Sequence, residues 1–188
     1  MPRLKFCCRY SLIASALVLF SLTFAHAQCK PPAKQNPPLS PAEQASVTLN
    51  GKEITIDYCA PSLRGRKVGG ELAPYGKVWR TGANTATTLK TQSTLHIGNL
   101  VVPAGTYTLY SLPGEHGWKL IVNKQTEQWG TVYNEDQDLG RVDMLEGAMP
   151  SAPVEKFLIN FEHTKGNKTE LHLHWDTTNV YVPITAVD

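Results

Sequence analysis

The chain has few cysteines and little excess charge of either sign, and these shortages exclude several classes of protein. Its 188 residues include 4 cysteines, and no two of them are spaced as Cys-x-x-Cys. A thiol oxidoreductase or a zinc knuckle would need that spacing, so neither is supported. The 18 basic and 16 acidic residues nearly balance, whereas a nucleic-acid-binding protein carries a strong basic excess. We therefore expect no nucleic-acid partner.

Helical periodicity and the common nucleophile motif are also missing. No stretch of about ten residues combines apolar residues at helical spacing with plausible caps. No serine lies in a Gly-x-Ser-x-Gly motif. A glycoside hydrolase would need two converging carboxylates, and Glu71 with Asp136 or Asp138 is a candidate pair whose separation the sequence does not give.

A long hydrophobic run occurs only near the start of the chain, at residues 11–25. Three basic residues precede this run, and Ala25-His26-Ala27 places small residues where a signal peptidase cuts. The run is shorter than the roughly 20 residues that cross a bilayer. We therefore expect residues 1–27 to be a cleaved signal peptide, with export to the periplasm or the extracellular space and no stable membrane span. An uncleaved anchor and lipidation of Cys29 are the alternatives.

Cleavage would leave Cys29 and Cys59 as the remaining cysteines, with 15 basic residues against 16 acidic ones. Two cysteines in an exported protein favour one disulfide, although two free thiols or pairing between chains would also fit. Residues 28–44 are rich in proline and predict an extended linker. The folded domain is then expected to span residues 45–188.

Beyond the linker, the dominant pattern is alternation of apolar and polar residues with a period of two. Asn50-Gly51 between two alternating segments predicts a hairpin with a type I′ turn. Further short strands are expected at residues 86–91, 95–97, 100–102, 107–112, 118–122, 157–161, 171–175 and 180–185. Together they predict a single all-β domain, a β-sandwich or flattened barrel of short, mainly antiparallel strands.

Residues 58–88 interrupt this pattern with a segment rich in glycine, arginine and aromatic residues. Between residues 60 and 90 there are six basic residues and one acidic residue. Arginine forks suit carboxylates and phosphates, aromatic rings can stack on sugars, and hydroxyl and amide groups add neutral hydrogen bonds. The predicted ligand-binding residues are Arg66, Tyr75, Trp79, Arg80, Thr81 and Asn84.

A purely structural role for this segment is the competing interpretation. Residues 127–155 hold seven acidic residues and one basic residue, Arg141. Arg80 could pair with Asp136, Asp138 or Asp143 and thereby fix a long loop, while Trp79 fills the core.

Several runs of this sequence resemble the domain of unknown function 2911 (DUF2911) family. They include Pro61, Gly65-Arg66, Pro74-Tyr75-Gly76 with Trp79-Arg80-Thr81-Gly82-Ala83-Asn84, Pro103-Ala104-Gly105-Thr106-Tyr107, 118–124 and 128–130. The resemblance spans about residues 45–185. It implies an exported bacterial protein with a predominantly β domain, and it assigns no catalytic residue, cofactor or substrate.

His172 and His174 lie two residues apart on an expected strand, so both side chains share one face. With His163 or His96 as a third ligand they could hold zinc or copper. Such a pair is more often the solvent-facing side of a strand, and we expect no metal and no cofactor.

The sequence as a whole favours non-catalytic binding of a small polar or anionic ligand, such as a glycan, by the 58–88 segment. One alternative is a hydrolase that uses a carboxylate near the same segment. A structural or partner-binding envelope protein is the other, and an exposed apolar patch would be its sign.

Overall fold

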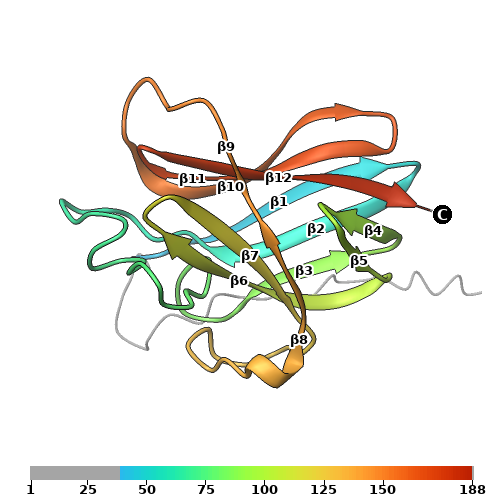
Figure 1. Ribbon diagram of the computed structural model, residues 1–188, viewed down its shortest axis with the longest axis horizontal. Coiled ribbons are helices and arrows are strands. Elements are labelled where there is room, and N and C mark those ends of the chain that lie inside the picture. The colour runs from blue at the N-terminus through green and yellow to red at the C-terminus, as the bar shows by residue number, and fades with distance from the viewer. Residues whose placement is uncertain (1–38, 188) are drawn as a thin grey trace, which may run out of the picture.

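The computed structural model describes residues 39–187, which form two antiparallel β-sheets packed on one another (Figure 1). The predicted all-β sandwich is confirmed, and the sheets do not close into a barrel. The described residues contain one short 3-10 helix, Glu135–Gln137.

The first sheet has the strand order β1-β2-β3-β6-β7-β8. Its strands are β1 (Ala42–Leu49), β2 (Lys52–Cys59), β3 (Thr87–Thr91), β6 (Gly105–Gly114), β7 (Gly117–Asn123) and β8 (Asp138–Asp143). The second sheet has the order β10-β11-β12-β4-β5, and β9 pairs with β12 beside this path. Its strands are β4 (Thr94–Ile97), β5 (Leu100–Val102), β9 (Leu145–Glu146), β10 (Val154–Lys165), β11 (Lys168–Asp176) and β12 (Thr178–Val187).

The turn between β1 and β2 follows directly from its sequence. Asn50 has a φ of 50° and Gly51 a φ of 73°, the two positive values that a type I′ turn requires. This turn sets the register that pairs Val47 with Ile54. Alternation along β2 then places Ile54 and Ile56 fully inside the sandwich.

Aromatic side chains fill one end of the core. Trp118 is the second residue of β7, while Phe157 and Trp175 come from the adjoining β10 and β11. All three are buried, and each contacts the ring of Trp79. This end of the core therefore lies beneath the long connection that contains Trp79.

The expected signal peptide 1–27, Cys29 and most of the 28–44 linker lie outside the described residues, so these expectations stay predictions. The first strand begins at Ala42, slightly earlier than the domain start expected at residue 45. Between residues 39 and 187, no helix has the length and apolar character needed to span a membrane.

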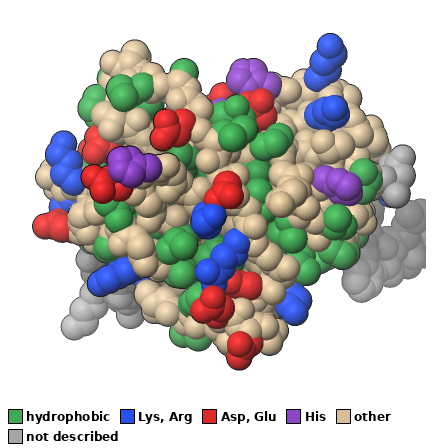
Figure 2. Space-filling view, viewed as in Figure 1, with side chains coloured by type: hydrophobic (Ala, Val, Ile, Leu, Met, Phe, Trp, Pro, Cys, Tyr) green, Lys and Arg blue, Asp and Glu red, His purple; other side chains and the backbone are tan. Residues whose placement is uncertain are grey.

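Charges of opposite sign lie close together on the face of the molecule seen in Figure 2. Near β8, Arg141 pairs with both Glu135 and Asp138, and Lys119 pairs with Asp143. This local pairing leaves no broad single-sign patch on that face.

Candidate functional site

The connection between β2 and β3, residues 60–86, is attached to the sandwich by backbone hydrogen bonds at several points. Trp79 exchanges two hydrogen bonds of 2.7 and 2.8 Å with Ser111 of β6. Near its start, Leu63 N–H donates to Glu155 O and Phe157 N–H donates to Pro61 O, which ties the connection to β10. The segment that lacks strand periodicity is thus fixed to both sheets.

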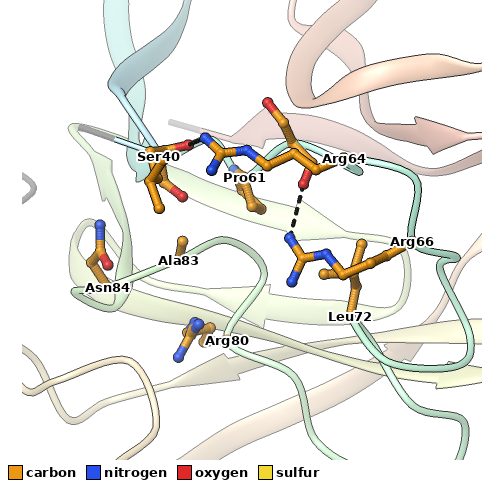
Figure 3. Close-up of a pocket in the computed structure, with 10 residues that line it drawn as sticks. Ser40, Pro61, Arg64, Arg66, Leu72, Arg80, Ala83 and Asn84 are labelled. Atoms are coloured by element: carbon orange, nitrogen blue, oxygen red, sulfur yellow. Dashed lines mark hydrogen bonds between the residues drawn. The ribbon is translucent and has the colours of Figure 1, made fainter. Parts of the chain in front are cut away.

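A cavity of about 330 Å³ opens along this connection. Two of the predicted residues that line it, Arg66 and Arg80, lie in the first and second halves of the connection, and Asn84 lies near its end (Figure 3). The remaining lining residues are Leu39, Ser40, Pro61, Ser62, Arg64, Leu72 and Ala83. The structure therefore brings together three of the six predicted site residues.

Arg64 and Arg66 are held in place by main-chain carbonyl groups. Arg64 Nη2 donates to Leu39 O at 2.9 Å. Arg66 donates from Nε to Leu63 O and from Nη2 to Ser62 O. Carbonyl oxygens orient a guanidinium without cancelling its charge, so both side chains keep a full positive charge at the cavity.

Arg80 is half-buried and donates from Nε to Gly82 O at 3.2 Å. Burial lowers the pKa of this guanidinium, because removal from water disfavours the charged form. Its stem passes over Gly130, where a Cβ atom would lie 2.7 Å from Arg80 Cδ and 2.7 Å from Asn84 O. The absence of a side chain at residue 130 thus permits the position of Arg80.

None of the three arginines forms an ion pair with a carboxylate among residues 39–187. Two of the three acidic residues proposed to fix Arg80 are engaged elsewhere, since Asp138 pairs with Arg141 and Asp143 pairs with Lys119, and Asp136 forms no ion pair with any of residues 39–187. The ion pairs that would have fixed a long loop through Arg80 are therefore not formed. Neither Glu71 nor any other carboxylate of residues 39–187 lines the cavity, so the described part of the chain places no pair of converging acids there.

Backbone strain collects around the same cavity. Arg64, Thr81 and Asn84 have φ values of 52°, 51° and 57°, which residues other than glycine adopt uncommonly. Thr81 is fully buried, and its hydroxyl lies 2.7 Å from the hydroxyl of Ser111. Thr87 Oγ1 donates to Thr81 O. Thr81, a predicted site residue, therefore supports the backbone beneath the cavity and does not line the cavity.

Trp79, another predicted site residue, is a core residue and only 7% exposed. Its indole stacks on Trp175 at a centroid distance of 5.3 Å and meets Phe157 and Trp118 edge-on. The competing interpretation placed Trp79 in the core, and the structure has it there. With Trp175 on its ring face, Trp79 is not an open platform for a sugar.

Tyr75 lies on the surface, half exposed, and does not line the cavity. Its ring covers Gly69, where an added Cβ would come within 2.4 Å of the ring. Gly69 has a φ of 76°. Tyr75 therefore packs against the tip of the connection, away from the arginines.

A second hollow of about 230 Å³ lies on the other side of Arg80. Leu72 and Arg80 line both hollows and thus lie between them. Tyr110, Gly130, Thr131 and Tyr133 complete the second hollow, with Val78 and Trp79. No carboxylate from the described part of the chain lines this hollow either.

Sequence reasoning missed Arg64, the third arginine of the cavity. It lies in the same basic segment as Arg66, and Arg64-Gly65 is a turn with positive φ at both residues. The turn directs Arg64 back toward Ser40 and Leu39 (Figure 3). The feature of the sequence that could have identified Arg64 is its place directly before a glycine within a basic, irregular segment.

Cys59 ends β2 at the edge of this site and is completely buried. Its carbonyl accepts a hydrogen bond from Ala83 N–H, and its sulfur lies 3.7 Å from Thr85 Oγ1. The predicted partner, Cys29, lies outside the described residues, so the disulfide stays a prediction.

No curated protein and no solved structure matches this chain. Residues 40–184 match the family described as "Protein of unknown function (DUF2911)". The match covers most of the chain and includes both sheets and the connection that forms the cavity. The resemblance seen in the sequence is confirmed, and the chain belongs to the DUF2911 family.

Proposed function

We propose that this protein is an exported, non-catalytic binding protein for a small ligand that carries a carboxylate or phosphate group. The ligand occupies the 330 Å³ cavity, with its anionic group between Arg66 and Arg80. Arg64 and Asn84 add further donors at the rim.

The observation that carries the proposal is the grouping of three arginines around one hollow, with no ion pair between their side chains and a carboxylate of residues 39–187. Like charges that line one hollow repel, and the partial burial of Arg80 adds to the cost of its charge. An anion bound among the guanidinium groups would relieve that cost and gain charge-assisted hydrogen bonds.

The arginines are also largely oriented before a ligand arrives. Arg80 uses Nε to contact Gly82 O, and its Nη1 and Nη2 make no hydrogen bond among the described residues. Arg66 keeps Nη1 available in the same way. Because these side chains are already positioned, binding loses less conformational entropy.

Cavity size and lining favour a small acid over a neutral glycan. A volume of about 330 Å³ is at the lower end of ordinary small-molecule sites, which run from about 300 to 1,000 Å³. The two aromatic residues expected to stack on a sugar are a core residue, Trp79, and a residue away from the cavity, Tyr75. A sugar acid, a sugar phosphate or a small polycarboxylate fits this chemistry.

Calorimetric titration with inorganic phosphate, citrate, glucuronate and neutral glucose tests the proposal. We expect at least one anion to bind and glucose not to bind. Arg80→Gln should weaken anion binding by about 10- to 100-fold, which corresponds to the loss of a hydrogen bond to a charged group.

The matched control is Lys77→Gln, which removes a positive charge from an exposed residue of the same connection that does not line the cavity. Equal affinities for the Arg80 and Lys77 variants would overturn the proposal, as would heat signals no larger for the acids than for glucose.

A further inference from the structure

The outer face of the second sheet carries a cluster of imidazole and carboxylate groups, separate from the arginine cavity. Strand register places Glu162 of β10 directly opposite Glu170 of β11, and Asn160 opposite His172. On the other side of β11, His172 is opposite Tyr181 of β12. The cluster therefore spans the three longest strands of this sheet.

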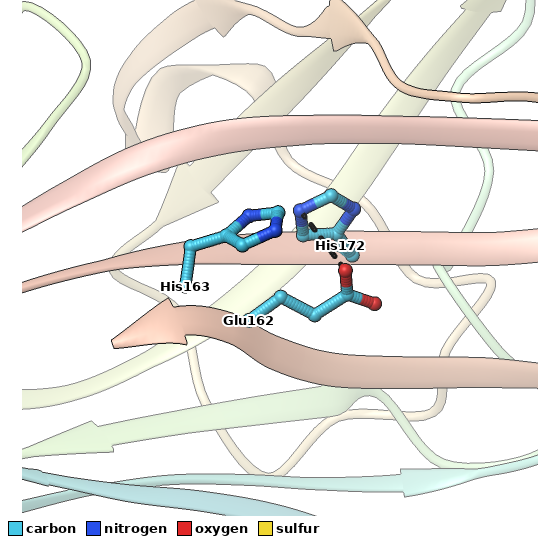
Figure 4. A group of neighbouring side chains, drawn as sticks. All are labelled: Glu162, His163 and His172. Carbon is cyan, nitrogen blue, oxygen red and sulfur yellow. Dashed lines mark ion pairs between the residues drawn. The ribbon is translucent and has the colours of Figure 1, made fainter. Parts of the chain in front are cut away.

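A β-bulge in β10 brings two consecutive residues to the same side. Neighbouring residues of a regular strand point to opposite faces. Here the register shifts between Glu162 and Lys165, and His163 has a φ of 51°. Both Glu162 and His163 reach toward His172 as a result (Figure 4), and one donor atom from each lies within 4.8 Å of the others.

His172 is buried, and its hydrogen bonds fix which ring nitrogen is available. Asn179 Nδ2 donates to Ala148 O at 2.9 Å, which turns Asn179 Oδ1 toward His172 Nδ1 at 3.0 Å. His172 Nδ1 must therefore carry the proton, and in the neutral ring Nε2 holds a lone pair. Metal-binding histidines are oriented by this kind of contact.

His172 Nε2 faces two carboxylates. Glu170 Oε2 lies 3.1 Å away and Glu162 Oε2 lies 3.8 Å away. Glu170 Oε2 is also 2.7 Å from His163 Nδ1. These groups need either protons on the imidazoles or a bound cation between them, because two carboxylates and a nitrogen lone pair would otherwise repel.

The other oxygen of Glu162 is occupied by supporting contacts. Asn160 Nδ2 donates to Glu162 Oε1 at 2.8 Å, and His174 Nε2 lies 3.0 Å from the same oxygen. These contacts leave Oε2 facing the cluster. His174, which the sequence suggested as a ligand, is thus a positioning residue, while Glu162 and Glu170 are the ligands that the sequence did not reveal.

We propose that His163 Nδ1, His172 Nε2, Glu162 Oε2 and Glu170 Oε2 bind one zinc ion. Zinc takes imidazole and carboxylate ligands at about 2.0–2.2 Å, which places ligand atoms roughly 3.3–3.6 Å apart in a tetrahedral site. Three of the separations among these atoms are 2.7, 3.1 and 3.8 Å, and donor atoms of Glu162, His163 and His172 lie within 4.8 Å of one another, so small side-chain shifts would reach that spacing. The side chain of His163 is 71% exposed, so the ion can enter from solvent.

The test is zinc titration of the full-length protein after treatment with a chelator. We expect about one zinc per chain by elemental analysis. We also expect cobalt substituted for zinc to give the visible absorption bands of a four-coordinate ion. His163→Ala should weaken zinc binding at least tenfold, and it should leave the fold intact because the side chain is exposed.

His96→Ala is the matched control. His96 is an exposed histidine of the same sheet, but it pairs with Thr185, several positions along β12 from Tyr181. Asn179→Ala should weaken zinc binding by about 10- to 100-fold through loss of the orienting contact. The proposal fails if wild type takes up less than stoichiometric zinc, or if the His163 and His96 variants bind zinc equally well.

Discussion

Trp79 and Arg80 are neighbours in the chain, yet their side chains belong to different environments. Trp79 is surrounded by the aromatic core, whereas Arg80 lies between two solvent-accessible hollows. Alternation in an extended backbone produces this division. Trp79 therefore contributes to the stability of the sandwich, and the neighbouring Arg80 contributes its charge to the cavity.

Gly130→Ala should lower both stability and anion affinity. The new Cβ would lie 2.7 Å from Arg80 Cδ and 2.7 Å from the backbone oxygen of Asn84. The arginine stem can move, but the Asn84 oxygen is part of the backbone that accepts the Gly130 hydrogen bond. We expect a loss of about 1–3 kcal/mol in the free energy of unfolding, measured by urea denaturation.

Gly70→Ala serves as the control for this substitution. Gly70 lies in the connection that forms the cavity, and an added Cβ would have only Lys67 O nearby, at 4.0 Å. Its unfolding free energy should change by less than about 0.5 kcal/mol. Equal stability of the two alanine variants would contradict the packing of Arg80 on Gly130.

At the scale of single residues, the sequence indicated which side chains are suited to bind an anion better than it indicated where those side chains lie. Arg66, Arg80 and Asn84 line one cavity, while their role in binding a ligand stays a prediction. The sequence left two alternatives for Trp79, the core or the ligand site, and it did not indicate that Thr81 is buried. Their burial depends on contacts with Trp175 and Ser111, which lie far away along the chain.

At the scale of elements, the segment between β7 and β8 contains a compact polar network. Tyr133 donates its hydroxyl hydrogen to Asp138 Oδ2 at 2.7 Å, and Arg141 contacts both residues. Burial, together with the hydrogen bond to Asp138 and its charge, raises the pKa of Tyr133 to about 12, although Arg141 acts in the opposite direction.

This raised pKa predicts a loss of stability in alkaline solution. Tyrosine in the unfolded chain ionises near pH 10, while Tyr133 in the folded protein holds its proton until about pH 12. Its contribution to stability is thus complete below about pH 10 and is lost as the pH rises from 10 to 12.

The Tyr133→Phe variant isolates this contribution. Urea unfolding at pH 9 and pH 11 should show that the stability of wild type falls more steeply than that of the variant. In an alkaline titration followed by absorbance at about 295 nm, the tyrosine that ionises at the highest pH should be missing from the variant. The urea-unfolded protein serves as the reference for tyrosines with the ordinary pKa. Parallel pH dependences for the two proteins would contradict the assignment.

Strands were predictable from the sequence because alternation is a local signal. The hairpin at Asn50-Gly51 and the strands on either side appear where the pattern placed them. The bulge at His163 was not predictable, because it depends on a register shift between β10 and β11 that no local motif marks. The carboxylates of the proposed zinc site were missed for the same reason.

At the scale of the whole molecule, the predicted Cys29–Cys59 disulfide would link the segment before β1 to the end of β2. Closing a loop of about 30 residues stabilises a protein by about 3–4 kcal/mol on the chain-entropy model. Cys29→Ser should lower the free energy of unfolding by that amount, measured by denaturation without reductant.

Reduced wild type provides the control, because it should unfold at the same denaturant concentration as the Cys29→Ser variant. Peptide mapping without reduction should recover the two cysteines in one linked fragment. Coincident unfolding of oxidised and reduced wild type would contradict this disulfide.

The two proposed sites differ in how much the sequence could say about them. The arginine cavity is built mainly from one continuous segment, so composition alone pointed to it. The imidazole and carboxylate cluster combines residues of β10 and β11, with support from β12. Only the strand order and register of the complete sheet bring those residues together.

The connection over the core is attached through main-chain groups at Pro61, Leu63 and Trp79, while the side chains of Arg64, Arg66 and Asn84 point into the cavity. Main-chain atoms therefore fix the path of the connection, and side-chain atoms set the charge of the cavity. Substitution of a lining side chain should accordingly change that charge while the path of the backbone is retained.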